Sequence, residues 1–415
     1  MRRVAFTLLI LFIYKAATWI PVPLLDTTLI KETIKGSGFI EFMDAFSGGA
    51  LGRYSIVALG ISPYITASIV TQLLQMDIIP IFKQWGEEGE TGKAKLNQVT
   101  RYIAVGLAFV QSIVLILGIS SANPENMLVM GADVPTAVAV IYMSVVMTAG
   151  TAFVLWLADL ITRKGVGNGS SMIIAAGILT SLPSMISTLW NQQITNGVGV
   201  KSTFIFWFIM FLYVVVLIGV IYMQIATRKI PTQYANRQGK SDSNIPIKLN
   251  TAGVIPVIFA STLMGLPMTF VSMANVDTTT GWGYWIDQIF VYTNPIGFML
   301  YIFLIFIFTF FYSFLIISPE KIADNLQKQN AFIPGVRPGE DTQDFIARVL
   351  FKITMLGATY LAILAIIPIV TSMIFDLPSV VSIGGTSLLI IVGVAVETIK
   401  QLETEATEKT YKGFM

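Results

Sequence analysis

The side chains that most often carry out chemistry in proteins are scarce in this sequence. The chain has 415 residues but no histidine and no cysteine. Histidine is the usual general base and transition-metal ligand, and the cysteine thiolate is a common nucleophile. The common hydrolase and metal-binding constellations are therefore excluded, and no Walker-type phosphate loop is present. We expect a protein that is not an enzyme and that has no metal and no cofactor.

The residues with the most suggestive spacing are apolar. Ile61 and Ile65 are four apart, so they share one face of a helix. Gly60 and Pro63 beside them should loosen or kink that helix near its outer half. Taken alone, such a pair most often packs or faces lipid, so the pair becomes informative only with further evidence.

A short polar-interrupted piece, residues 39–53, precedes this pair. It contains Glu41, Asp44, Gly48, Gly49 and Arg53. As a helix it would reach about 22 Å, whereas the hydrocarbon core of a bilayer is about 30 Å thick. It cannot span, so it is either a surface loop or a re-entrant piece that is buried in protein or lines a watery cavity.

The elements around these residues are membrane spans. A mean hydropathy of +0.74 with 12% charged residues indicates an integral membrane protein. We expect ten spans, and therefore both termini on one side. The predicted spans are 4–19, 55–78, 102–119, 137–160, 171–190, 203–226, 253–273, 296–317, 349–374 and 381–400.

The basic residues indicate the orientation. Most of the 26 Lys and Arg residues fall on the chain ends and on alternate loops. The positive-inside rule then places both termini in the cytoplasm. Two of the basic loops, 227–250 and 318–347, are long, which favours a docking role over simple solvated connectors.

The spans divide into two halves, residues 1–190 and 191–415, with five spans each. An odd number of spans per half gives the halves opposite orientations, which permits an inverted repeat around a central path.

Several motifs resemble one known family. In chain order they are MDAFSGGALGRYSIVALGISPYITASIVTQLL, RKGVGNGSS, KIPTQYANR, IPIKLNTAGVIPVIFAS, EKIADNLQKQNAFIPGVRPGEDT and GGTSLLIIVGVAVETI. Together they are similar to the SecY/Sec61 alpha family of protein-conducting channels, over nearly the whole chain. The chain departs from that family in starting almost at its first span and in its short C-terminal tail.

The resemblance implies an all-α membrane fold of ten helices in two inverted five-helix halves around a central hourglass pore. It implies an apolar pore ring formed by Ile61, Ile65, Ile174, Ile258 and Ile390. A sixth ring position falls on Ser170, which is polar, so either the correspondence is weaker there or the ring has five members.

The resemblance also implies a plug and a lateral gate. The plug corresponds to about residues 39–53, and its matching residues are Phe42, Phe46, Ser47, Gly48, Gly49 and Arg53. The gate lies between the second and seventh spans, with the third and eighth spans beside them. Its matching polar positions are Gln111, Ser261 and Thr262, which could equally be ordinary interhelical packing residues.

The implied partners are a SecE-like and a SecG-like small membrane subunit, the SecA motor ATPase, the ribosome, signal sequences, unfolded preproteins and the lipid bilayer. Arg337, in the PGVRPG turn, and Arg228, Lys229 and Arg237 match the docking loops for SecA and the ribosome. The implied location is the bacterial plasma membrane, with preproteins crossing it and signal sequences leaving sideways.

Three alternatives remain. A secondary transporter shares inverted halves, but coupled transporters usually carry ionisable residues near the membrane midplane. Here Lys15 is the clear charge within a span, while Asp77, Asp159 and Glu397 lie near span ends. A membrane-embedded enzyme is the second alternative. An aspartyl protease of this kind would need two midplane Asp residues, which the predicted spans do not offer. A paralogue that exports a narrow set of glycoproteins is the third, although the basic loops favour the general channel.

Overall fold

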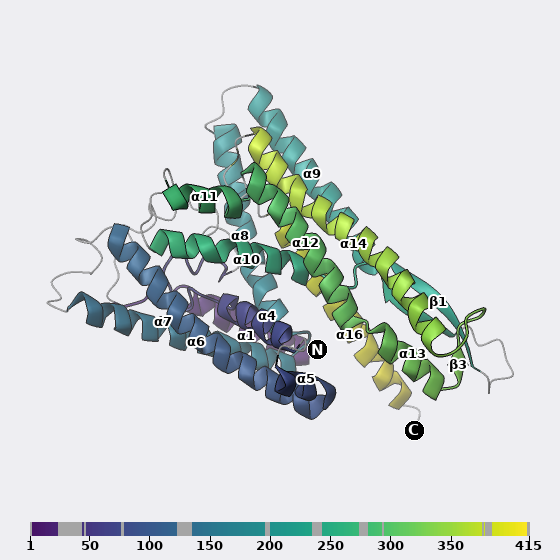
Figure 1. Cartoon of the computed structure of the whole chain (residues 1–415). Coiled ribbons are helices and arrows are strands. Elements are labelled where there is room, and N and C mark those ends of the chain that lie inside the picture. The colour runs from purple at the N-terminus through teal and green to yellow at the C-terminus, as the bar shows by residue number, and fades with distance from the viewer. Residues whose placement is uncertain are drawn as a thin grey trace.

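A computed structural model describes residues 2–23, 44, 47–75, 79–122, 135–195, 200–234, 243–273, 281–292, 294–375, 377 and 384–412. The described part is helical apart from a small three-stranded sheet (Figure 1). A helix lies on each of the ten predicted spans. They are α1 (Arg2–Ala17), α4 (Ser62–Leu74), α6 (Glu90–Ala122), α7 (Thr136–Lys164), α8 (Gly169–Trp190), α9 (Val200–Ile225), α10 (Ile255–Met273), α12 (Pro295–Ile316), α14 (Glu340–Phe375) and α16 (Gly384–Lys412).

Six helices in the described part are long and apolar enough to cross a bilayer unaided, which confirms the all-α membrane fold. They are α6, α7, α8, α9, α12 and α14. Shorter helices connect the spans, namely α5 (Pro80–Glu87), α11 (Gly281–Phe290) and α13 (Pro319–Lys328), and a π-helical turn, Asn191–Thr195, extends α8. Figure 1 shows both chain ends on the side that carries α5, α13 and the sheet, with α11 on the opposite side.

The helices pack in two groups. α4 packs on α6, α6 on α7, and α7 on α8 and α1, whereas α12 packs on α10 and α14, and α16 on α9. The groups meet where α16 lies against α8 and where α10 lies against α4 and α6. A division of the chain into halves at residue 190 stays a prediction.

The second span differs from its prediction. Residues 51–61 form turns, and α4 begins only at Ser62. Gly60 takes a left-handed conformation (φ +54°) just before the helix, and Pro63 lies in its first turn, where the missing N–H costs little. The expectation that Gly60 and Pro63 loosen or kink a helix near its outer half is therefore wrong, because the helix begins only at Ser62 and both residues set where it starts.

The two long basic loops are folded together. β1 (Thr227–Tyr234) pairs antiparallel with β2 (Ser243–Lys248) on one side and with β3 (Ala331–Phe332) on the other. The sheet covers α13 and the start of α14, and one apolar cluster fills the space between them. Ile230, Ile247, Leu326 and Ile346 are among its buried members. We call this unit, residues 227–234, 243–248 and 319–353, the basic subdomain; the simple-connector interpretation does not describe it.

Candidate functional site

The five isoleucines come together from four helices. Ile61 at the start of α4, Ile174 on α8 and Ile390 on α16 are buried members of one apolar cluster, 4%, 6% and 3% exposed. Ile65 on α4 and Ile258 on α10 are partly buried and pack against the same cluster. Positions up to 329 residues apart in the sequence (61 to 390) thus share one apolar centre at the junction of the two helix groups.

The start of α4 explains how Ile61 and Ile65 reach this centre. Ile61 is the N-cap residue, and its carbonyl accepts a hydrogen bond from the amide of Ile65 at 3.1 Å. One helical turn therefore separates the two side chains on a single face. The turn that precedes α4 is pressed onto α7, because a side-chain carbon at Gly150 would lie 1.9 Å from the carbonyl oxygen of Ile56.

Ser170 lies one turn before Ile174, at the start of α8. Its amide donates to the side chain of Asn168, the N-cap residue of α8, at 3.1 Å. Its own side chain is partly buried and interacts with Tyr64 of α4. Ser170, the doubtful sixth position of the predicted ring, thus lies one helical turn from Ile174 on α8. It offers a hydroxyl where the other predicted positions offer methyl groups.

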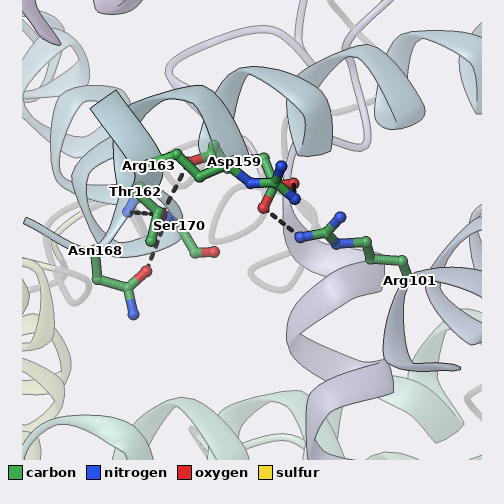
Figure 2. Close-up of polar contacts among 8 residues, drawn as sticks. Arg101, Asp159, Thr162, Arg163, Asn168 and Ser170 are labelled. Atoms are coloured by element: carbon green, nitrogen blue, oxygen red, sulfur yellow. Dashed lines mark hydrogen bonds and ion pairs between the residues drawn. The ribbon is translucent and has the colours of Figure 1, made fainter. Parts of the chain in front are cut away.

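An ion-pair network fixes the helix ends next to Ser170 (Figure 2). Arg101 of α6 pairs with Asp159 of α7, and Arg163 of α7 pairs with the other oxygen of the same carboxylate at 3.3 Å. Thr162 Oγ1 accepts from the amide of Gly169 at 2.9 Å. The position of Asp159 near a span end was evident from the sequence, but its two cationic partners could not be deduced from that position.

The 39–53 segment is described at residue 44 and from residue 47 to 53. Phe42 and Phe46 lie outside the described residues. Gly48 and Gly49 are both left-handed, with φ of +71° and +80°. The Arg53 guanidinium lies over the ring of Trp19, 4.1 Å from its centroid, a distance typical of a cation–π contact.

This segment touches the isoleucine cluster. Ala50 is a fully buried member of the cluster that contains Ile61, Ile174 and Ile390. The segment also contacts α1 through Tyr14, which belongs to the same cluster, and through Lys15. These two contacts were not predicted, although a lysine inside an apolar span was a signal for the second one.

The polar gate positions lie where the helix groups meet. Gln111 on α6 and Ser261 on α10 are partly buried, and Thr262 on α10 is buried. Both hydroxyls donate to the carbonyl of Ile258 in their own helix, each at 2.8 Å. Within the described residues no hydrogen bond joins Gln111 to either of them.

A different pair bridges the two helix groups here. The hydroxyl of Tyr312 on α12 donates to Gln72 Oε1 on α4 at 2.5 Å. The Tyr312 ring packs edge-on against Phe259 of α10, with centroids 4.8 Å apart, and Ile65 and Ile69 of α4 complete this apolar cluster. No sequence signal pointed to this pair, because its members are 240 residues apart.

Three of the four basic residues predicted to dock SecA or the ribosome lie exposed on the basic subdomain. Arg228 and Lys229 are exposed on β1, and Arg237 lies outside the described residues. Arg337 is exposed in the turn between β3 and α14, where Gly335 and Gly339 take left-handed conformations. Thr342 Oγ1 donates to the carbonyl of Arg337 at 2.7 Å, which fixes the turn that presents the guanidinium.

No group of three acidic side chains that could hold a metal ion occurs among the residues that the structure describes. The arrangement is therefore a packed apolar centre with polar supports at its edges.

Comparison with known proteins matches this architecture. A family model described as SecY matches residues 55–399. The chain is 42% identical over 422 residues to the protein translocase subunit SecY of Halalkalibacterium halodurans, covering 100% of this chain and 96% of that relative. It is 43% identical over 426 residues to the same subunit of Staphylococcus aureus, covering 99% and 96%.

Solved structures share the fold. The first is a SecY structure, described as showing that the plug domain stabilises the closed state of the translocation channel. It has a TM-score of 0.66 at 17% identity, and the match covers 97% of this chain and 92% of that one. Sec61 in the canine ribosome–channel complex has a TM-score of 0.64 at 16% identity, with the same coverage. At these identities the likeness concerns the fold alone.

Proposed function

Because the chain belongs to the SecY family and is thus a subunit of a protein-conducting channel, we propose that unfolded secretory proteins cross the bacterial plasma membrane through it. Signal sequences and membrane segments leave the same path sideways into lipid. The chain is a multi-pass membrane protein, and its basic ends and basic subdomain face the cytoplasm, as the distribution of Lys and Arg favours.

The observation that carries this proposal is the meeting of five isoleucines from four helices in one apolar centre. A ring of methyl and methylene groups offers no hydrogen bonds to water or ions, so a narrow constriction made of it dewets and blocks leakage. Isoleucine is also stiff at χ1, which helps the ring keep its shape. Such a surface gives a passing peptide no specific grip, as a channel for many substrates requires.

The 39–53 segment acts as the plug in this proposal. Its contact with the isoleucine centre through Ala50 supports that role. The left-handed Gly48 and Gly49 end its helical turn. A free-energy difference of about a few kcal/mol between the plugged and open states would let a substrate shift the population.

The sideways exit runs between α4 and the pair α10 and α12. The seam there is closed by side-chain packing around Phe259 and Tyr312 and by the Tyr312–Gln72 hydrogen bond. Hydrogen bonds between membrane helices contribute roughly 0.6–2 kcal/mol, so such a seam can reopen. Ser261 and Thr262 border the exit but act through packing, since both hydroxyls bond within α10. Gln111 lies on α6, which packs against α10 beside the exit.

The basic subdomain is the docking surface for the SecA motor and the ribosome. Arg337 stands on a stiffened turn and can bind a carboxylate or phosphate through two donors. Arg228, Lys229 and Arg237 add positive charge suited to RNA phosphates. A SecE-like and a SecG-like subunit complete the assembly in this proposal, and the energy for transport comes from the partners.

The test of the seal uses purified protein reconstituted in vesicles with its SecE-like partner. Replacing Ile61, Ile65, Ile174, Ile258 and Ile390 by serine should raise the resting ion conductance, because water can enter a polar ring. The control replaces the lipid-exposed Ile218 and Ile307 by serine. A conductance of the ring variant no higher than that of the control would overturn the seal.

A further inference from the structure

Lys15 is a cation inside the first membrane span that the channel function does not explain. It lies on the last turn of α1 and is partly buried. A lysine within a span is costly unless it pairs with other groups. Here its Nζ donates to the carbonyl of Gly48, in the 39–53 segment, at 2.9 Å.

The residue before it makes a parallel contact. Tyr14 is 1% exposed, and its hydroxyl donates to the carbonyl of Ser47 at 3.0 Å. Two consecutive residues of α1 thus bind two consecutive carbonyls of the segment. The amide of Gly49 donates to the carbonyl of Asp44 at 2.9 Å, so this is the end of a helical turn, where carbonyls otherwise lack partners.

This turn also lies directly against α8. A side-chain carbon at Gly48 would lie 2.8 Å from Thr180 Oγ1 and 3.0 Å from the Cα of Gly177. The turn is therefore held by α8, which it touches closely, and by α1, which supplies the hydrogen bonds.

The chain on either side of the segment is tied down independently. The amide of Val22 donates to the carbonyl of Tyr54 at 2.8 Å, and that of Ile56 to the carbonyl of Ile20 at 2.9 Å. These bonds anchor residues 54–56 and leave the turn at residues 47–49 to be held by its own contacts.

We propose that Tyr14 and Lys15 form a clasp that holds the plug under the isoleucine ring and sets how often the channel opens without a substrate. The clasp rests on the plug assignment made under the proposed function. It binds main-chain carbonyls, so it acts on the position of the turn and not on particular side chains. When the plug leaves, Lys15 loses its acceptor inside the membrane, and this loss favours return of the plug.

The chain has no cysteine, so a single introduced thiol is uniquely reactive. The parent for the test carries Ala50→Cys, at a plug position that is fully buried in the isoleucine cluster. A water-soluble maleimide added from the outer side labels this thiol only when the plug has left. We expect Tyr14→Phe and Lys15→Met each to raise the labelling rate about three- to tenfold, the range for loss of one hydrogen bond.

Two controls accompany the test. Lys15→Arg keeps a cationic donor and should label at close to the parent rate. Tyr222→Phe removes a hydroxyl from an exposed tyrosine of α9 and should change nothing. If Lys15→Met does not insert, Tyr14→Phe, which deletes one oxygen atom, decides the matter.

Labelling of Tyr14→Phe at the parent rate would overturn the clasp. Preprotein transport by the unsubstituted protein is measured in parallel, since its absence would refute the proposed function instead. Transport with unchanged labelling refutes the clasp alone, and labelling that rises as expected supports the clasp whether or not transport succeeds.

Discussion

At the scale of the residue, two acidic side chains of the described part lie close to the isoleucine centre. Asp159 is paired with Arg101 and Arg163, and Asp44 of the 39–53 segment is partly buried. Burial raises the pKa of its carboxyl group above the ordinary value of 3.8, although the Gly52 amide, which donates to Asp44 Oδ1 at 2.6 Å, and the nearby Arg53 and Lys15 oppose the rise. A raised pKa means that the docked segment binds the proton more tightly than a segment exposed to water.

This shift predicts a pH dependence of plug docking. A carboxyl group with a raised pKa in the docked state stabilises docking while it is protonated, and that stabilisation is lost as the pH rises from 3.8 through the raised pKa. The docked state should therefore be most stable in acid. The test measures the labelling rate of the Ala50→Cys protein at each pH and divides it by the rate of the protein that carries both Ala50→Cys and Asp44→Asn. This ratio should increase as the outer pH rises from 3.8 through the raised pKa.

Taking the ratio removes the pH dependence of the thiol itself, because both proteins carry the same introduced thiol. A ratio that stays constant, or that falls as the pH rises, would contradict a raised pKa at Asp44.

At the scale of the element, the Tyr312–Gln72 hydrogen bond joins α12 and α4 across the proposed sideways exit. Removing this hydrogen bond should make the exit easier to open. Tyr312→Phe keeps the ring packed on Phe259 but deletes the hydroxyl that reaches Gln72. A marginally hydrophobic segment in a translocating chain should then enter lipid about threefold more often, as expected for a hydrogen bond of about 0.6 kcal/mol between membrane helices.

The measurement is the ratio of membrane-integrated to fully translocated product in reconstituted vesicles. Tyr142→Phe, at an exposed position on α7, is the matched control. Equal ratios for Tyr312→Phe and Tyr142→Phe would show that the bridge does not restrain the seam.

The basic subdomain leads to a prediction about the motor. Arg337→Glu reverses the charge at the tip of a turn that Thr342 holds from behind, so the fold of the subdomain should persist. SecA-driven transport should fall about tenfold or more, because a charge-assisted contact contributes about 1.5–3 kcal/mol. Lys164→Glu, an exposed change at the end of α7 and outside the basic subdomain, serves as the comparison.

Preserved SecA binding and preserved transport with Arg337→Glu would remove this turn from the docking surface. Thermal unfolding of both variants at the temperature of the unsubstituted protein would show that neither change acts through the fold.

At the scale of the whole molecule, the sequence predicts the helices better than their junctions. Long apolar runs define the spans, because a bilayer requires satisfied backbone groups and about 20 apolar residues, and the SecY family was recognisable from six motifs. The start of α4 was misplaced, since hydropathy cannot tell the turns at residues 51–61 from a helix. The pairing of β1 with β3 was missed, because its partners Gln233 and Phe332 are 99 positions apart and meet only in the folded chain.

The site shows the same division. The isoleucines could be named by their motifs, yet only the folded chain brings Ile61, Ile174 and Ile390 into one cluster. Tyr14 was invisible in the sequence because its partner is a main-chain carbonyl. The Tyr312–Gln72 pair was equally hidden, since hydrogen bonds across a helix seam depend on how the two helix groups dock. Pore ring, plug, gate and docking roles stay predictions.

The central claim is that these five isoleucines surround a chain in transit. The most direct measurement stalls a preprotein that carries a single cysteine inside the channel and forms disulfide crosslinks by mild oxidation. Single cysteines are introduced in turn in the channel at Ile61, Ile65, Ile174, Ile258 and Ile390 and at the exposed Ile218 of α9. The account predicts crosslinks from the same stalled substrate position to all five ring sites and none to Ile218. Crosslinks that avoid the ring sites, or that favour Ile218 over them, would contradict it.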